Sequence, residues 1–342
     1  MIQNKDNFKQ ILIGIPTTIN TINYIYKTLQ RIRLEILEFP IYPNIVICIN
    51  GEGDKLNLKK EIEKFQAHCQ PLSIILLETE ISGKNNALNL IINYARKIKA
   101  TILHLVDDDV IFRKGTLLLN TKTLILKKQS QKLPVLVGAN FKGIRHSMSY
   151  FLKQEKSFFK AIKKWFFHKV FIIPFLDKIE NPTYCSGQCI SSFVNLLPDI
   201  PDNKYGVTDD AYLSRYFAIL GKNNFFKKNI EPIIKPQNSI IYFKVTSSPQ
   251  AWLKQQTRIW IGVKKANALF EKDKKYLLDY FANPFSYTGS SFKMPKGLPI
   301  KYLLFYLIYR YFEKKLQKIV YNMQKNNEIP EWNTPLDTKK IH

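Results

Sequence analysis

Three consecutive carboxylates, Asp107, Asp108 and Asp109, directly follow the largely apolar run 101–106. Like charges repel, and burial at the end of a strand adds a desolvation cost to each ionised carboxylate. A divalent cation would offset that cost, and oxygen ligands suit magnesium or manganese, which usually also bind substrate phosphates. The triplet therefore indicates a metal-dependent enzyme that acts on a phosphate-bearing substrate. The alternative is an acidic loop that caps the next helix.

A lysine stands at the predicted start of a helix earlier in the chain. The helix is predicted from apolar residues at helical spacing, which places its start near Lys84. A cation at a helix N-terminus opposes the helix dipole, so a purely structural lysine is unfavourable there, whereas a bound anion reverses the argument. Lys84 therefore indicates an anion site, with a solvated lysine as the alternative. The residues that set the spacing are Ala87, Leu88, Ile91, Ile92 and Ala95.

Two later segments add further groups that could do chemistry. Asp209 and Asp210 begin a predicted helix, where they are either dipole partners or a general base kept ionised by the dipole and by Arg215. Gln255 and Arg258 lie three residues apart and share a helix face. An arginine beside an amide can bind a diphosphate or a sugar hydroxyl, although an ordinary amphipathic helix would give the same pattern.

The elements that must position these residues follow from the apolar runs at 11–15, 45–49, 73–77 and 102–106. These short runs alternate with helical stretches, which predicts an α/β fold with a Rossmann-like, mostly parallel central sheet flanked by helices. In such open sheets, ligands bind beyond the carboxyl ends of the strands. The acidic triplet is predicted to lie at that edge.

In chain order, these segments resemble the family-two glycosyltransferases, which have a GT-A nucleotide-sugar-binding fold. Residues 11–20 are similar to the family's first strand and its Pro-Thr-x-x-Asn turn, and residues 45–54 to its second strand and nucleotide-contacting loop. Residues 83–89 resemble the Gly-Lys-x-x-Ala-Leu-Asn segment, and the whole resemblance covers roughly residues 10–262. The donor-binding residues that it implies here are Pro16, Thr17, Thr18, Asn20, Asn50, Glu52, Asp54, Lys84, Asn85 and Asn89.

The second-strand loop departs from the family, which often has Asp where this chain has Ile49-Asn50. That substitution removes the carboxylate that usually contacts uracil in the family. Asn50, Glu52 or Asp54 could replace it, and the sequence leaves these three alternatives open.

The acidic segments resemble two further family motifs. Asp107 and Asp109 fit the Asp-x-Asp motif that binds metal and nucleotide, with Asp108 between them. Asp209-Asp210 resembles the end of the Thr-Glu-Asp motif, with Asp209 one methylene shorter than the usual Glu. In the family, the final Asp of that motif is the catalytic base. The resemblance thus implies that Asp210 is the base and that Asp107 and Asp109 hold Mg²⁺ or Mn²⁺.

The remaining motif residues lie nearer the C-terminus. Gln255 and Arg258 fit the Gln-x-x-Arg-Trp motif of chain-building members such as chitin, cellulose and hyaluronan synthases, but Trp260 comes one residue late. One residue rotates a helical side chain by about 100°, so chain extension and single transfer both stay open. A small-residue segment that lines donor sugar and acceptor in the family corresponds to the region around Gly187.

The resemblance therefore implies an inverting hexosyl- or N-acetylhexosaminyltransferase of polysaccharide or glycolipid biosynthesis. Its donor would be a nucleoside-diphosphate sugar, with UDP as the expected nucleotide, and its acceptor a hydroxyl of a glycan or glycolipid. The metal neutralises the leaving diphosphate while Asp210 takes the proton from the acceptor. A metal-dependent nucleotidyltransferase of similar α/β shape is an alternative.

The 342 residues are predicted to form a catalytic domain at 1–245, a C-terminal helical appendage at 246–325 and a polar tail at 326–342. No zinc-type spacing links the four cysteines, which are expected to be reduced thiols. The start of the chain has no signal-peptide pattern, and no apolar run reaches the roughly 18 residues of a membrane span. We expect a cytoplasmic protein, either free or peripheral on the cytoplasmic face of a membrane.

The net charge of +25 points to an anionic partner. Lysines and aromatic residues interleave at 151–169 and again at 298–321, a pattern that suits an anionic membrane surface. The alternative is that these aromatics pack on the catalytic domain. A nucleic-acid-binding protein is disfavoured, because no helix-turn-helix, zinc-finger or RNP pattern appears and the acidic triplet would repel phosphate.

Overall fold

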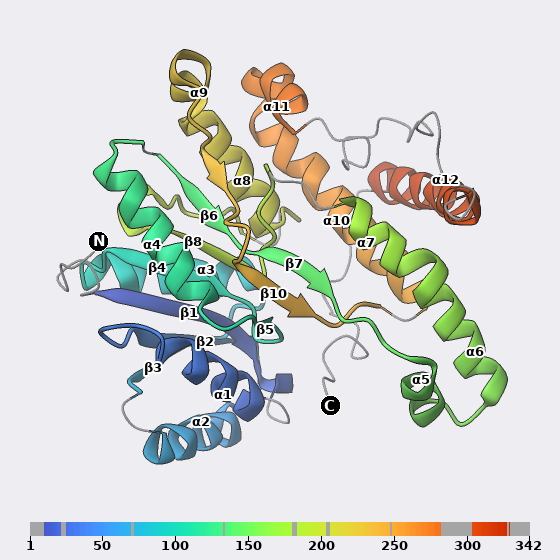
Figure 1. Cartoon of the computed structure of the whole chain (residues 1–342), viewed down its shortest axis with the longest axis horizontal. Helices are drawn as coiled ribbons and strands as arrows, with labels where there is room; N and C mark the ends of the chain where they lie inside the picture. Colours follow the sequence, from blue (N-terminus) through green and yellow to red (C-terminus); the bar gives the residue numbers. More distant parts are fainter. Residues whose placement is uncertain are drawn as a thin grey trace.

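The computed structural model describes residues 10–21, 25–69, 72–132, 134–179, 183–202, 206–246, 248–281, 303–326 and 328. Its centre is a seven-stranded sheet in the order β3-β2-β1-β4-β8-β6-β9 (Figure 1). All of its strands are parallel except β8, which runs antiparallel to both neighbours. The strands are β1 (Ile11–Thr18), β2 (Asn44–Asn50), β3 (Ile74–Thr79), β4 (Ile102–Val106), β6 (Leu136–Gly138), β8 (Cys189–Phe193) and β9 (Ile233–Ile234).

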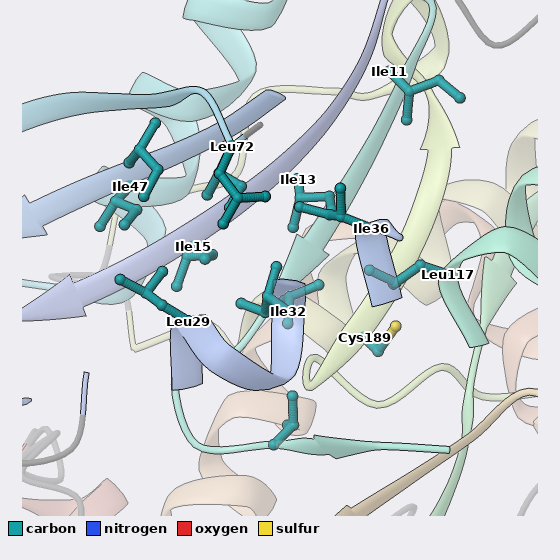
Figure 2. Packing of buried hydrophobic residues seen from close by; sticks show 14 of the residues in the cluster. Ile11, Ile13, Ile15, Leu29, Ile32, Ile36, Ile47, Leu72, Leu117 and Cys189 are labelled. Carbon is teal, nitrogen blue, oxygen red and sulfur yellow. The ribbon is translucent and has the colours of Figure 1, made fainter. Parts of the chain in front are cut away.

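The predicted α/β class is confirmed, and each of the four apolar runs forms a strand of this sheet. Such continuous apolar runs form strands because helices cover both faces of a parallel sheet, so side chains on both sides of each strand are buried. On one face, Ile11, Ile13 and Ile15 of β1 pack with Ile32 and Ile36 of α1 (Ile25–Ile36), as Figure 2 shows. The same cluster includes residues of α2 (Leu56–His68) and α4 (Thr116–Gln129).

The opposite face is covered by the two helices that begin with the predicted anion-site lysine and acidic pair. Leu12 of β1 packs in one cluster with Leu88 and Ile91 of α3 (Lys84–Lys97) and with Leu213 and Phe217 of α8 (Asp209–Leu220). Both helices start at the carboxyl edge of the sheet, where Lys84 and Asp209 lie beside residues at the ends of β1 and β2. That edge is where the sequence predicts the ligand.

A second, three-stranded sheet flanks the first, in the order β5-β10-β7. Its strands are β5 (Ile111–Phe112), β7 (Asn140–Gly143) and β10 (Ile240–Phe243), and β10 is parallel to β7 but antiparallel to β5. The sequence did not predict this sheet, because its strands are too short to show a two-residue period. It also did not predict that β8 runs antiparallel.

The remaining helices build the side of the molecule away from β3 (Figure 1). A helical segment runs from Phe158 to Ile179 as α6, a five-residue π-turn η3 and α7, and it packs with α10 and α12 through an aromatic cluster. None of the helices in the described ranges combines the length and the apolar character needed to cross a bilayer. The helices are α5 (Met148–Gln154), α6 (Phe158–Phe167), η3 (His168–Ile172), α7 (Ile173–Ile179), α9 (Lys222–Lys228), α10 (Pro249–Leu269), α11 (Lys274–Tyr280) and α12 (Leu303–Lys325).

The predicted boundary at residue 246 falls just before α10. Helix α10 packs against α8 of the predicted catalytic domain as well as against α12. The division into 1–245 and 246–325 stays a prediction. Of the predicted tail 326–342, all but residues 326 and 328 lie outside the described residues, as do residues 298–302 of the second aromatic stretch.

Candidate active site

A cleft of about 610 Å³ lies at the carboxyl edge of the central sheet, between the strand ends and helix α10. Segments far apart in the sequence meet there, because the ends of β1, β2 and β4 and the starts of α3 and α8 all open toward this edge. The structure brings most of the predicted site residues to the cleft. Those that line it are Pro16, Thr18, Asn20, Asn50, Glu52, Lys84, Asp107, Asp108, Asp109, Gly187, Asp209, Asp210, Gln255 and Arg258.

Lys84 links the two acidic segments of the cleft. Its Nζ lies 2.6 Å from Asp107 Oδ1 and 3.0 Å from Asp209 Oδ2. Burial disfavours the ammonium charge, but the two carboxylates outweigh that effect and hold the pKa of Lys84 above its ordinary value. Burial raises the pKa of Asp209 to about 6, although Lys84 opposes the shift. The lysine at the start of α3 thus has two anionic partners in the protein itself.

Gly187 closes this arrangement from the segment before β8. Its carbonyl oxygen accepts a hydrogen bond from Lys84 Nζ at 3.3 Å. A Cβ on Gly187 would lie 2.6 Å from Asp209 Oδ2 and 3.2 Å from Lys84 Nζ. A larger residue at position 187 would therefore displace the ends of the Asp209 and Lys84 side chains and disturb their ion pair.

Asp108 differs from the other two carboxylates of the triplet. It is only 5% exposed, its Oδ2 accepts a hydrogen bond from Thr17 Oγ1 at 2.8 Å, and its backbone carbonyl accepts one from Thr28 at 2.5 Å. Asp108 therefore anchors the loop after β4 to β1 and α1. Thr17, predicted to bind donor, does not line the cleft and serves this anchor instead.

Asn50 ties the end of β2 to its neighbours. Its Nδ2 donates to the carbonyl of Thr17 at 2.6 Å, and its Oδ1 accepts from the backbone N–H of Gly83 at 3.1 Å. Gly83 has φ +123°, a backbone conformation that residues other than glycine rarely adopt. Both ends of the Asn50 amide bind backbone, whereas Glu52 is exposed and brings a carboxylate of this loop to the cleft.

Asp210 sits at the first turn of α8, where backbone N–H groups favour an anion. Its Oδ1 accepts the N–H of Ala211 at 2.7 Å, and its Oδ2 lies 3.5 Å from the N–H of Gly187. The sequence predicts that Arg215 supports Asp210. The hydrogen bonds of the Arg215 guanidinium go instead to Asn267 Oδ1 of α10 and to the carbonyl of Ala211 in its own helix. The helix start positions Asp210 through the N–H of Ala211, and the charges of Arg215 and Arg258 interact with its carboxylate.

Arg258 and Gln255 reach the cleft from α10. Burial lowers the pKa of Arg258, and the nearby carboxylates of the two acidic segments oppose that shift. Trp260 does not reach the cleft; it is buried in the aromatic cluster with α12. Its shift of one position along the helix turns it toward the core.

Three other residues predicted to bind donor also lie outside the cleft lining. Asp54 Oδ1 accepts the N–H of Leu56, the first residue of α2. Asn85 donates to the carbonyls of Pro201 and Val207, and Asn89 exchanges hydrogen bonds with the backbone of residue 200. Both asparagines bind the loop before α8 to α3, because helix positions one and five residues after Lys84 turn away from the strand ends.

The part of the cleft away from the carboxylates is lined largely by apolar side chains, and the sequence did not predict these lining residues. Apolar side chains such as Phe175 and Trp252 have the spacing of ordinary core residues, so nothing marks them as lining a cavity. Two buried polar atoms on this side, Trp252 Nε1 and Gln256 Oε1, have no hydrogen-bond partner among the described residues. The apolar half is lined by Phe141, Ile172, Phe175, Leu176, Phe243, Val245 and Trp252.

The described residues contain no group of three or more His, Cys, Asp and Glu placed to hold a metal ion. The donor set that is present consists of carboxylates, since Asp107 and Asp109 line the cleft at the end of β4. Magnesium and manganese are commonly held by one or two carboxylates together with substrate phosphates rather than by a complete protein cage. The residues at the cleft therefore fit a divalent cation that binds together with a phosphate-bearing substrate.

No protein-family model and no curated protein matches the chain. Among solved structures it is similar to the mannosyltransferase PcManGT from Pyrobaculum calidifontis in complex with GDP-Man and Mn²⁺, with a TM-score of 0.51 and 15% identity over 77% of this chain. The chain has a GT-A fold. The match covers 64% of that mannosyltransferase. Weaker similarities include S. aureus TarS, at TM-score 0.44, 15% identity, 78% of this chain and 43% of that one.

This GT-A fold confirms the architecture implied by the sequence resemblance. The similarity to the mannosyltransferase extends over 77% of this chain despite the low identity. At that identity the likeness concerns the fold alone.

Proposed function

We propose that this protein is a glycosyltransferase that moves a sugar from a nucleoside-diphosphate sugar to an acceptor hydroxyl. The observation that carries the proposal is the meeting of two acidic segments at one cleft, 107–109 and 209–210, with Lys84 between them. A structural role does not require so many buried and half-buried charges at a solvent-accessible edge. A site that binds a divalent cation together with an anionic donor accounts for them.

We propose that Asp107 and Asp109 hold Mg²⁺ or Mn²⁺ on the donor diphosphate. The similar mannosyltransferase was solved with Mn²⁺ and GDP-Man, which supports a metal and a nucleotide sugar. When bound, the cation neutralises charge on the leaving nucleoside diphosphate. Lys84 and Arg258 add positive charge around the phosphates. UDP is the nucleotide we infer, from the sequence resemblance.

Asp210 is the general base in this proposal. Its carboxylate takes the proton of an acceptor hydroxyl while that oxygen forms a bond to the anomeric carbon of the sugar. The bond from that carbon to the diphosphate oxygen breaks with its electron pair, so the configuration inverts in a single displacement. One base is sufficient for this reaction, and the Asp210 carboxylate lies at the start of α8, where it accepts the backbone N–H of Ala211.

The acceptor we propose is a glycan or a glycolipid, and the transferred group a hexose or an N-acetylhexosamine. The apolar half of the cleft supports an acceptor with extensive apolar surface. We propose that Trp252 Nε1 and Gln256 Oε1, which are buried without a partner among the described residues, become a donor and an acceptor for substrate hydroxyls when the acceptor binds.

Donor hydrolysis by the purified protein tests the proposal. UDP-, GDP- and dTDP-sugars are incubated with Mn²⁺, Mg²⁺ or a chelator, and free nucleoside diphosphate is measured. We expect release from one donor that depends on metal and is lost in Asp109→Ala. Absence of both hydrolysis and metal-dependent nucleoside-diphosphate binding would refute the assignment, and release of pyrophosphate from a nucleoside triphosphate would indicate a nucleotidyltransferase.

A further inference from the structure

Helices α5 and α6 present a surface on which exposed apolar and cationic side chains alternate. Phe158 is 60% exposed and Phe159 75%, and Leu152 and Phe166 are also exposed. The only acidic residue in the sequence 148–176, Glu155, is paired with Lys164. The exposed lysines of this surface, called here the α5–α6 face, are Lys153, Lys156, Lys160, Lys163 and Lys169.

The aromatic residues of this face are not part of the core. Helix α6 packs inward through Ala161 and Phe167, which are buried. Phe159, Lys163 and Phe166 are spaced four and three residues apart and therefore share the outer side of the helix. The sequence leaves two interpretations of 151–169 open, contact with an anionic membrane surface or packing on the catalytic domain. Packing accounts for the buried Phe167 but not for the exposed phenylalanines.

The α5–α6 face is also connected to the cleft. The helical segment that begins with the exposed Phe158 continues through η3 and α7, where Ile172, Phe175 and Leu176 line the apolar half of the cleft. Phe166 and Phe175 are roughly 14 Å apart along such a helix. One element therefore carries exposed aromatics at its start and the apolar wall of the cleft further along.

We propose that the α5–α6 face docks on an anionic membrane surface and holds the apolar half of the cleft beside it. Aromatic side chains insert at the boundary between headgroups and acyl chains, and lysines nearby are attracted by anionic lipids. The net positive charge of residues 148–176, where Glu155 is the single acid, selects an anionic surface over a neutral one. A lipid-linked acceptor would then reach the cleft directly; this consequence, unlike the docking, rests on the proposed function.

Sedimentation of the full-length protein with lipid vesicles tests the docking. Vesicles of phosphatidylcholine alone are compared with vesicles that also contain phosphatidylglycerol, at low and high salt. We expect binding to the anionic vesicles that weakens with salt. The double variant Phe158→Ser/Phe159→Ser should bind at least about tenfold more weakly than the wild type, because two apolar side chains no longer insert. Lys160→Glu/Lys163→Glu should lose the preference for anionic lipid.

The matched control is Phe226→Ser. Phe226 is 66% exposed and precedes Lys227 and Lys228, but α9 lies at the far end of the molecule from α6 (Figure 1). It should bind like the wild type. Failure of the wild type to sediment with anionic vesicles would overturn the proposal, as would double variants that bind normally or a control that loses binding equally. Nucleotide binding, measured on the same samples, reports separately on the transferase assignment.

Discussion

At the scale of single residues, the cleft assigns different roles to carboxylates that the sequence shows as equivalents. Asp108 accepts hydrogen bonds from Thr17, through its side chain, and from Thr28, through its carbonyl, whereas the carboxylate of Asp107 forms an ion pair with Lys84. Asp209 is buried against Lys84, and Asp210 is the half-buried member of the second pair. Neighbouring residues on a helix point in directions about 100° apart, so adjacent acids in a sequence seldom share an environment.

Asp210→Asn tests the base at this scale. The amide keeps the size of the carboxylate but cannot take a proton, so we expect transfer to fall by about two to four orders of magnitude. Donor binding should stay within a few-fold of wild type, because Asp210 is not proposed to contact the diphosphate. Product formation and nucleotide affinity are measured on the same sample. Asp199→Asn removes an exposed carboxylate paired with Arg96 and is the control; normal turnover in Asp210→Asn would rule out the base.

At the scale of elements, helix α10 fixes the start of α8. A Cβ on Gly262 would lie 2.4 Å from Thr208 Cγ2 and 3.2 Å from the backbone nitrogen of Thr208. Thr208 is the residue immediately before α8 and therefore directly before the acidic pair. Close approach of the two helices at Gly262 thus determines where the acids of α8 meet the cleft.

Gly262→Ala should push α10 away from the start of α8. Overpacking of this kind costs about 1–3 kcal/mol, which we expect to see as a lower thermal unfolding midpoint together with reduced transfer. Thr208→Ser removes the methyl group that the new Cβ would meet. The double variant Gly262→Ala/Thr208→Ser should therefore recover part of both losses, and equal stability of Gly262→Ala and wild type would contradict the close contact.

Glu35 links another pair of elements. Both of its carboxylate oxygens accept backbone N–H groups at the start of α4, from Gly115 and Leu117 at 2.9 Å. Burial raises the pKa of Glu35 to about 7, with Glu38 adding to the shift and the backbone hydrogen bonds opposing it. The folded protein therefore holds a proton that the unfolded chain releases at lower pH. Stability falls as pH rises from the unfolded pKa to the folded one.

Glu35→Gln should flatten this dependence, since the amide does not ionise. Between about pH 4 and 8 we expect the wild type to lose on the order of 2 kcal/mol more unfolding free energy than the variant. Denaturant unfolding at several pH values measures this difference. Glu61→Gln on α2, where the carboxylate is paired with Lys64 at the surface, serves as control. Parallel profiles for Glu35→Gln and wild type would contradict the argument.

At the scale of the whole molecule, the sequence predicted the half of the cleft that charged residues build. Apolar runs fixed the parallel strands, and Lys84 and the two acidic segments lie at the edge where such a sheet binds ligands. Asn85 and Trp260 were assigned from motifs alone, and their side chains turn away from the cleft. The apolar half was not predictable, because Phe175 in a cavity wall has the same local pattern as a core phenylalanine.

The two halves of the cleft differ in chemistry, which suggests that they bind different substrates. Strand ends and helix starts of the central sheet hold the charged half, and η3, α7 and the second sheet hold the apolar half. Helix α10 contributes to both, with Arg258 near the carboxylates and Trp252 among the apolar residues. If donor and acceptor bind in different halves, a change in the apolar half should alter transfer without altering donor binding. Gln256 allows a sharp test, because its Oε1 is buried without a partner among the described residues.

Gln256→Met keeps the length of the side chain and removes the unpartnered oxygen. A buried polar atom without a partner costs about 1–3 kcal/mol, so the variant should unfold at the same temperature as wild type or a few degrees higher. Transfer to the acceptor should fall about tenfold for loss of one hydrogen bond, while donor hydrolysis stays unchanged. Gln324→Met, an exposed change on α12, should affect neither. A parallel fall in hydrolysis and transfer would show that Gln256 serves the donor, and the division of the cleft into two halves would then be wrong.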